Sequence, residues 1–143
     1  MRTNVFISGP MSGFTNYNMD AFMDAHAELK KAGADLVFNP ILKWLNEPER
    51  VSQCRTHESY MLICLAELTA YEPHQQNADA IVPKYDLLVH LDGWQNSPGA
   101  KTEVTVAEAI GIQTMDLQAA CNLIRTRQIE AIERRPLQRY SPV

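Results

Sequence analysis

Short apolar runs alternate along this chain with longer segments of helical periodicity, and this alternation constrains the fold more than any other feature of the sequence. Four runs bounded by turn residues are too short for helices and are predicted to be strands: 4–8, 36–38, 87–91 and 113–117. The run 87–91 is apolar almost throughout, which is typical of a strand covered on both faces. Strands that alternate with helices predict an α/β three-layer sandwich with a mostly parallel sheet.

The segments between these runs carry helical patterns. Apolar side chains recur at helical spacing over 16–32, and Gly33 suits the C-terminal cap of that helix. Three further helices are predicted, over 56–70, 98–111 and 118–135. The polar segment 71–77 is predicted to be a loop. With 143 residues the chain, 1–143, has the size of one domain, and the helix 118–135 is interpreted as its appendage.

Charge and cysteine content narrow the classes of partner. The net charge of −4 gives no global basic field for a nucleic-acid polymer or an anionic membrane, so a small anion needs a local site. Cys54, Cys64 and Cys121 are widely spaced without a CxxC pair, so neither a metal site nor a disulfide framework is expected, and no cofactor is predicted. No signal peptide and no apolar run of about 18 residues is found, which favours a cytoplasmic protein.

Two loops are candidates for ligand binding. In an open parallel sheet, ligands bind beyond the carboxyl ends of the strands. Those positions are residues 8–13, after the first strand, and residues 92–97, after the strand 87–91. Both loops carry glycine and polar side chains, and a helix begins near each of them. We therefore expect the two strands to be neighbours and the two loops to share one site.

The helix over 98–111 begins with residues that suit an anion. Ser97 is predicted to be its N-cap, Pro98 fits the first turn, and Gly99 lets a ligand approach the backbone. Free N–H groups and the positive end of the helix dipole can hold a phosphate or a sugar hydroxyl.

Glu103 lies in the apolar arc of that helix. At about 100° per residue, Ala100, Val104 and Ala107 share its side, which should face the sheet or a cavity. A carboxylate in such a place is costly unless it is paired or functional. Glu103 is therefore interpreted either as a cap or buried-pair residue, or as a catalytic group.

Other residues near these loops have two interpretations each. Asp92 is either a turn residue or a ligand-binding group. Trp94 either stacks on a base or covers the edge of the core. His57 and His74 have no metal-ligand spacing, so no metal site is predicted.

Two motifs resemble a known family. The first is Ile7-Ser8-Gly9-Pro10-Met11-Ser12-Gly13 followed by Tyr17-Asn18, and the second is Leu91-Asp92-Gly93-Trp94 with Ser97, Gly99-Ala100 and Glu103. Together they resemble DUF4406, a domain family of unassigned function common in bacteria and phages. That family is similar to nucleoside 2-deoxyribosyltransferases and to 2'-deoxynucleoside 5'-monophosphate N-glycosidases. The resemblance covers residues 4–117.

The resemblance implies a Rossmann-like, nucleoside 2-deoxyribosyltransferase-like fold in which Glu103 is the nucleophile at the anomeric carbon of a nucleoside or nucleotide. A carboxylate that attacks through an oxocarbenium-like transition state splits one hard step into two. Water as acceptor gives hydrolysis, and a second base gives transfer. The expected substrate-binding residues are Ser8, Gly9, Pro10, Met11, Ser12, Gly13, Asn18, Asp92, Gly93, Trp94, Ser97 and Gly99.

One position bears on the substrate. Six residues before the glutamate, the similar transferases have an aspartate, whereas the monophosphate glycosidases have serine. Ser97 occupies that position here. An aspartate would repel a phosphate, and a serine can bind one, so a 5'-monophosphate substrate is favoured.

The sequence departs from the family pattern at a second acidic residue. Relatives carry an acid about eight positions before the aspartate that precedes the central strand, where it helps protonate or orient the base. Counting back from Asp86 gives Ala78, with Asp79 one position away, whereas aligning on the helix that contains Tyr60 gives Cys64. The stretch 71–84 resembles an insertion. Asp79 is our candidate, and without a second acid the protein would be slow or would only bind.

Three hypotheses remain open. The first is an N-glycosidase or deoxyribosyltransferase acting on a nucleotide or nucleoside. The second is a catalytically weak nucleotide- or nucleotide-sugar-binding protein that sequesters or senses its ligand, and the third is a structural domain without ligand. A homodimer or larger homo-oligomer is expected, because relatives complete the pocket with a neighbouring subunit and because apolar residues near Trp44 and Tyr60 need cover.

Overall fold

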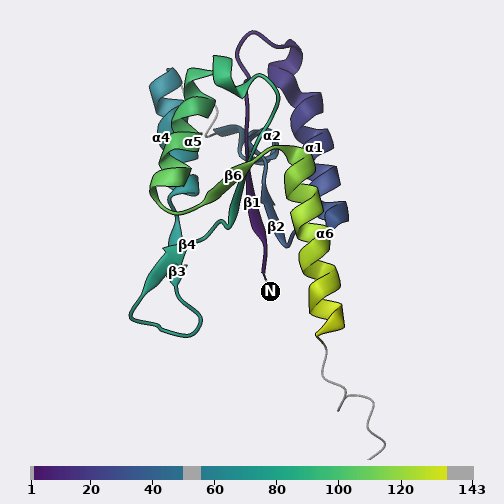
Figure 1. Ribbon diagram of the computed structural model, residues 1–143. Helices are drawn as coiled ribbons and strands as arrows, with labels where there is room; N and C mark the ends of the chain where they lie inside the picture. The colour runs from purple at the N-terminus through teal and green to yellow at the C-terminus, as the bar shows by residue number, and fades with distance from the viewer. Residues whose placement is uncertain (1, 50–55, 135–143) are drawn as a thin grey trace, which may run out of the picture.

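A four-stranded parallel sheet with the order β2-β1-β5-β6 forms the centre of the protein (Figure 1). The computed structural model describes residues 2–49 and 56–134. The strands are β1 (Asn4–Ser8), β2 (Leu36–Phe38), β5 (Leu87–His90) and β6 (Gln113–Met115). β1 and β5 pair in parallel, with Phe6 opposite Leu88. The predictions of a parallel sheet and of neighbouring strands at 4–8 and 87–91 are confirmed.

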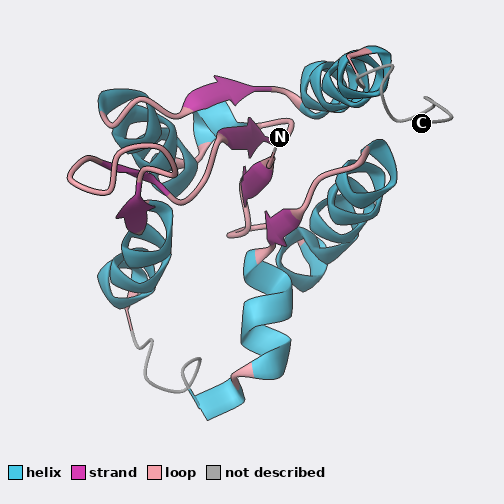
Figure 2. Ribbon diagram, turned by 90° about the horizontal axis from the view of Figure 1, so that it is seen from below, coloured by secondary structure: helices cyan, strands magenta, loops and turns pink. Residues whose placement is uncertain are grey.

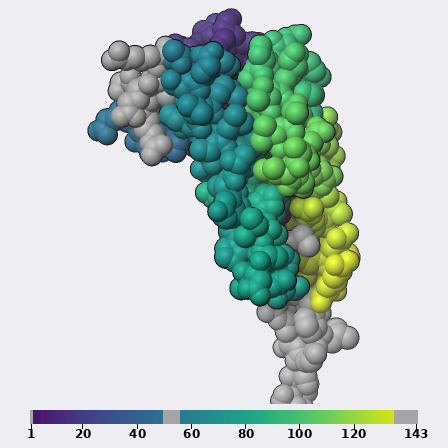
Figure 3. All heavy atoms as spheres, turned by 90° about the vertical axis from the view of Figure 1, so that its left-hand side faces the viewer, coloured from purple at the N-terminus to yellow at the C-terminus, as the bar shows by residue number. Residues whose placement is uncertain are grey.

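Helices cover both faces of this sheet, which makes the fold a Rossmann-like three-layer α/β sandwich (Figure 2). α1 (Met19–Ala32) and α6 (Leu117–Glu133) pack on one face. α4 (His57–Leu68) and α5 (Pro98–Ala109) pack on the other, and Figure 3 shows these two helices side by side on the surface.

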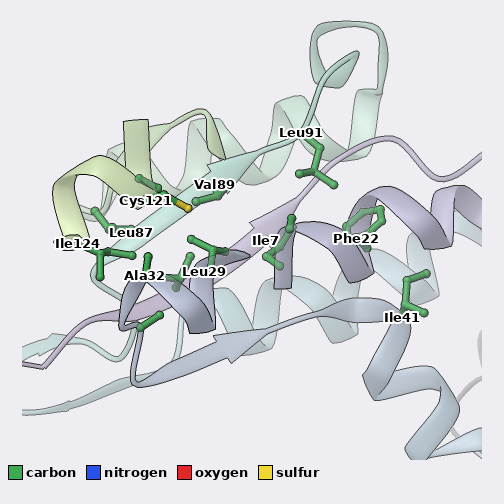
Figure 4. Packing of buried hydrophobic residues seen from close by; sticks show 14 of the residues in the cluster. Ile7, Phe22, Leu29, Ala32, Ile41, Leu87, Val89, Leu91, Cys121 and Ile124 are labelled. Atoms are coloured by element: carbon green, nitrogen blue, oxygen red, sulfur yellow. The ribbon is translucent and has the colours of Figure 1, made fainter. Parts of the chain in front are cut away.

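Alternate residues of the central strands serve the two faces, because successive side chains of a strand point in opposite directions. Ile7 and Val89 belong to the core under α1 and α6, together with Phe22 and Leu29 (Figure 4). The core under α4 and α5 contains Phe6, Leu88, Val104 and Ala107. Full burial of a side chain of the size of Leu or Phe stabilises the fold by about 1.5–3 kcal/mol. Both faces of β5 are apolar for this reason.

The predicted start of the first helix is wrong. A helix over 16–32 was expected, but α1 begins at Met19 and is preceded by the short 3-10 segment η1 (Thr15–Asn18). Asn16, Tyr17 and Asn18 have φ values of 50°, 55° and 64°, in the left-handed region. Three successive non-glycine residues in that region break the helical path, and asparagine tolerates it better than most side chains.

A helix and a β-hairpin were not predicted. α2 (Pro40–Asn46) follows β2, and Asn39 caps it by accepting a hydrogen bond from the Ile41 N–H at 3.0 Å. The predicted loop 71–77 instead contains β3 (Tyr71–Pro73), which pairs antiparallel with β4 (Ile81–Pro83). This hairpin projects beyond the amino ends of β1 and β5 (Figure 1).

The crossover connections reverse direction between β1 and β5. The chain leaves β1 for α1 on one face of the sheet and leaves β5 for α5 on the other. Such a reversal opens a crevice at the carboxyl ends of the two strands, where open α/β sheets bind ligands.

Within the described ranges 2–49 and 56–134, no helix is long and apolar enough to cross a membrane. α6 packs Ala120, Cys121 and Ile124 into the core. Cys54 and residue 135, the last of the helix predicted over 118–135, lie outside the described residues.

Candidate active site

The hydroxyl of Ser8 donates a hydrogen bond to Oε1 of Glu103, with an oxygen–oxygen distance of 2.7 Å. Ser8 ends β1, and Glu103 lies near the start of α5. Their contact spans the crevice between the two crossover connections. The sequence predicted both residues as members of one site, and the structure brings them together.

Glu103 is buried, with 7% of its surface exposed. Burial raises the pKa of Glu103 to about 7, and the hydrogen bond from Ser8 offsets part of that rise because it stabilises the charged form. A carboxyl group with a pKa near neutrality can change its protonation state at working pH, which is a property of catalytic acids, bases and nucleophiles.

The start of α5 has the predicted capping. Ser97 Oγ accepts a hydrogen bond from the Ala100 N–H at 3.2 Å, and Pro98 occupies the first turn. The Ser97 hydroxyl proton can therefore point to a ligand while its oxygen caps the helix. Gly99 and Glu103 lie four residues apart and so on the same side of α5.

A cleft of about 390 Å³ opens above Glu103. Six of its lining residues were predicted from the sequence: Gly9, Met11, Ser12, Ser97, Gly99 and Glu103. The remaining lining residues are Tyr17, Trp44, His57, Tyr60, Met61 and Ala100. This volume lies in the range of pockets that hold small organic ligands.

Three aromatic side chains form one side of the cleft, here called the aromatic wall: Tyr17, Trp44 and Tyr60. The ring centroids of Tyr17 and Trp44 are 5.9 Å apart, and those of Trp44 and Tyr60 are 4.8 Å apart, both edge to face. The Tyr60 hydroxyl donates to Met11 Sδ at 3.0 Å, which ties α4 to the loop after β1. Aromatic faces of this kind stack on nucleobases.

α4 approaches the start of α5 closely because residue 99 has no side chain. A Cβ atom at Gly99 would lie 3.1 Å from Met61 Sδ and 3.2 Å from His57 Cε1. Gly99 therefore lets His57, the first residue of α4, lie beside the first turn of α5. Both helices begin toward the top of the view in Figure 1, and His57 and Gly99, from their first turns, line the cleft.

The two motif loops pack against each other. A Cβ atom at Gly9 would lie 2.9 Å from Leu91 Cβ, so only glycine fits there without a shift of the backbone. Pro10 is buried and lies near Gly93, and the Asn18 side chain donates to the Pro10 carbonyl at 3.0 Å. These residues shape the loop that holds Met11 and Ser12 in the cleft.

Several predicted site residues do not line this cleft. Asp92 and Asn18 line a separate hollow beside α1. The ring of Trp94 stacks on His90 at a centroid distance of 4.6 Å and packs against the core under α4 and α5. Gly13 is exposed, with a φ of 84°.

Asp79 is not brought to the cleft. It is exposed in the connection between β3 and β4, at the amino ends of the central strands, whereas Glu103 lies at their carboxyl ends (Figure 1). Cys64, the alternative position, is buried in α4 and is not among the cleft-lining residues. Among the cleft-lining residues that the structure describes, Glu103 is the single carboxylate, and there is no lysine or arginine.

Sequence reasoning missed Trp44, His57, Tyr60 and Met61 as site residues. Asn39-Pro40 is a helix-start signal that could have revealed α2 and hence Trp44. His57 and Tyr60 carry no local motif, because only the packing of α4 on α5 brings them to Glu103.

The cleft offers a nucleophile or base, hydroxyl and N–H donors, and apolar faces. Within the part of the chain that the structure describes, no group of three or more histidine, cysteine or acidic side chains could hold a metal ion.

Comparison with known proteins gives one match. A family model described as a domain of unknown function, DUF4406, matches residues 3–116, from the start of β1 to the end of β6. The matched segment contains every residue that lines the cleft. The comparisons with curated proteins and with solved structures gave no match.

Proposed function

The chain belongs to the DUF4406 family, and from its active-site geometry we propose that it is an enzyme that cleaves or exchanges the N-glycosidic bond of a nucleoside 5'-monophosphate or nucleoside, with Glu103 as the nucleophile. The observation that carries this proposal is the buried Glu103 carboxyl group, held by Ser8 at 2.7 Å at the base of a cleft with an aromatic wall. The resemblance to nucleoside 2-deoxyribosyltransferases and to monophosphate N-glycosidases supports the same chemistry.

The reaction proceeds in two steps. The Glu103 carboxylate forms a bond to C1' of the sugar as the bond from C1' to the base nitrogen breaks and its electron pair leaves with the base. The base takes up a proton, from water or from a cleft residue. Water then attacks C1', loses a proton and frees Glu103, which completes hydrolysis; attack by the nitrogen of a second base gives transfer.

The cleft suits the three parts of such a substrate. Ser97 and the N–H groups of the first turn of α5 face an anionic group, as helix starts commonly do. Glu103 lies one turn further along α5, within reach of the sugar. The aromatic wall offers faces for the base.

A substrate panel tests this proposal. Wild-type protein is incubated with the common deoxynucleosides, ribonucleosides and their 5'-monophosphates, and released base is measured by chromatography. Base released from at least one substrate supports the proposal. A panel without released base, with or without an added acceptor base, contradicts it.

A second candidate function is a binding protein with weak or no turnover. The observation in its favour is that the cleft-lining residues that the structure describes contain no second carboxylate to protonate the leaving base. The same panel separates the two candidates, because a binder gives a thermal shift with a nucleotide and no released base.

We also propose that the protein forms a homo-oligomer in which a second copy covers the outer side of α4. This helix is apolar on nearly all sides, yet only Cys64 and Leu68 in it are buried. Leu62 is 72% exposed. A helix with apolar residues all round is normally buried, so a second copy that packs on α4 accounts for the pattern.

A further inference from the structure

His57 lines the cleft beside the start of α5. The contact with Gly99 places the His57 ring beside the first turn of α5, two residues beyond the Ser97 cap. Glu103 lies one turn deeper on the same side of that helix. His57, Ser97 and Glu103 thus follow one another along the cleft.

The charged side chains that line the cleft bear on how a 5'-phosphate would be bound. The cleft-lining residues that the structure describes include the Glu103 carboxyl group and no lysine or arginine. A 5'-phosphate carries about −2 at neutral pH. The positive end of one helix is equivalent to roughly +0.5 charge, which by itself balances only part of the phosphate charge. Glu58, next to His57 on α4, is exposed and is not among the lining residues.

His57 is the one described lining side chain that can add a positive charge at this end of the cleft. Its side chain is exposed and lines the cleft. An imidazolium N–H that donates to a phosphate oxygen makes a charge-assisted hydrogen bond, which is about twice as strong as a neutral one.

On these grounds we infer that His57 recognises the 5'-phosphate, together with Ser97 and the first turn of α5, and thereby selects a nucleoside 5'-monophosphate over the unphosphorylated nucleoside. The inference rests on the proposed function for the placement of the sugar over Glu103. Gly99 favours the close approach of His57 to α5, because a Cβ atom there would crowd both Met61 Sδ at 3.1 Å and His57 Cε1 at 3.2 Å.

Nuclear magnetic resonance of the histidine rings tests this inference without turnover. The Glu103→Gln variant is titrated with the common 2'-deoxynucleoside 5'-monophosphates, with the matching deoxynucleosides and with inorganic phosphate. The His57 Cε1–H signal, assigned with a His57→Gln variant, should move with the monophosphates and with inorganic phosphate and stay in place with the nucleosides. A His57 signal that ignores the monophosphates, or that moves equally with the nucleosides, would overturn the inference.

Affinity measurements on variants complete the test. His57→Gln should weaken monophosphate binding about tenfold to a hundredfold, while His57→Lys should keep most of it by restoring a positive charge. His74→Gln, a change at a histidine of the β3–β4 hairpin outside the cleft, is the matched control and should bind as the parent does. Equal binding by His57→Gln and the control overturns the inference, as does a His57→Lys variant that binds no better than His57→Gln.

These results are independent of catalysis. If the His57 signal responds to monophosphates but the wild-type protein releases no base, His57 recognises the phosphate and the proposed reaction is wrong. Wild-type protein that releases base from monophosphates while the His57 signal stays unmoved rejects the recognition role alone.

Discussion

Ser8 Oγ lies 2.7 Å from Glu103 Oε1, so the end of one central strand holds the carboxyl group of the helix that follows the neighbouring strand. The serine hydroxyl is the donor and favours the ionised carboxylate, whereas burial disfavours it. The balance leaves the pKa of Glu103 at about 7.

The first prediction concerns the pH dependence of kcat/KM. A nucleophilic Glu103 must be ionised, so the rate should rise as the pH increases through about 7. Ser8→Ala removes a hydrogen bond to the charged form, and the midpoint of the profile should move up by about one unit or more. pH–rate profiles of both proteins check this, with Ser12→Ala as the control in the same cleft. An unchanged midpoint in Ser8→Ala would separate Ser8 from the ionisation of Glu103.

The second prediction concerns stability and needs no substrate. The pKa of Glu103 is about 7 in the folded protein and about 4.5 in the unfolded chain, so the unfolded chain releases its proton first as the pH rises. The free energy of unfolding should therefore fall between pH 4.5 and 7, by about 3 kcal/mol, and stay level above that range. The Glu103→Gln variant has no ionisable group at this position, so its free energy of unfolding should not show this fall. Its Tm at pH 8 should therefore be higher than that of wild type.

Thermal unfolding of both proteins at pH 5 and pH 8 provides the measurement. The advantage of Glu103→Gln over wild type should be larger at pH 8 by about 5–10 °C. An equal difference at the two pH values would mean that Glu103 titrates near its ordinary value in the folded protein.

The sequence was sufficient to predict the elements and site residues that depend on local signals. β1 and β5 are short apolar runs that end in glycine-bearing loops, and they pair as predicted. Ser97-Pro98-Gly99 is a helix start by its residue types, and it caps α5 as predicted. Glu103 was identified as a candidate because it is a carboxylate on the apolar side of the helix predicted over 98–111. Each of these inferences needed only residues close in the chain.

Other features depend on contacts between distant segments. Trp44 on α2, Tyr60 on α4 and Tyr17 in the left-handed turn meet only in the folded protein, so no periodicity points to the aromatic wall. The strands β3 and β4 have three residues each and contain Pro73 and Pro83, which weakens any strand signal. Counting back along the sequence placed Asp79 near the site, but the hairpin carries it to the opposite end of the sheet.

The third prediction concerns Ser97. Its hydroxyl should donate to a phosphate oxygen, a bond worth about 1.5–3 kcal/mol for a charged acceptor, so Ser97→Ala should lower the preference for a monophosphate over its nucleoside about tenfold to a hundredfold. Ser97→Asp should lower it further, because a second negative charge within about 4 Å repels the phosphate. The ratio of the two specificity constants is the measurement. Equal losses on both substrates would assign Ser97 to helix capping alone.

The fourth prediction concerns assembly. Light scattering at micromolar protein should give the mass of a dimer or larger oligomer, because α4 presents apolar side chains that the described residues 2–49 and 56–134 leave uncovered. Leu62→Lys should shift the protein toward a monomer. Ile129→Lys, at another exposed apolar residue, on α6, should not. A monomeric wild-type protein, or equal effects of the two changes, would count against an interface on α4.

The most direct measurement is the rate of base release by wild-type protein and by Glu103→Gln, on the substrate that the panel identifies and at a pH above 7. The variant keeps the size and polarity of the side chain but removes the nucleophile, so the rate should fall at least about a thousandfold while the circular dichroism spectrum stays that of a folded protein. A variant that retains a rate within about tenfold of wild type would show that Glu103 is not the nucleophile.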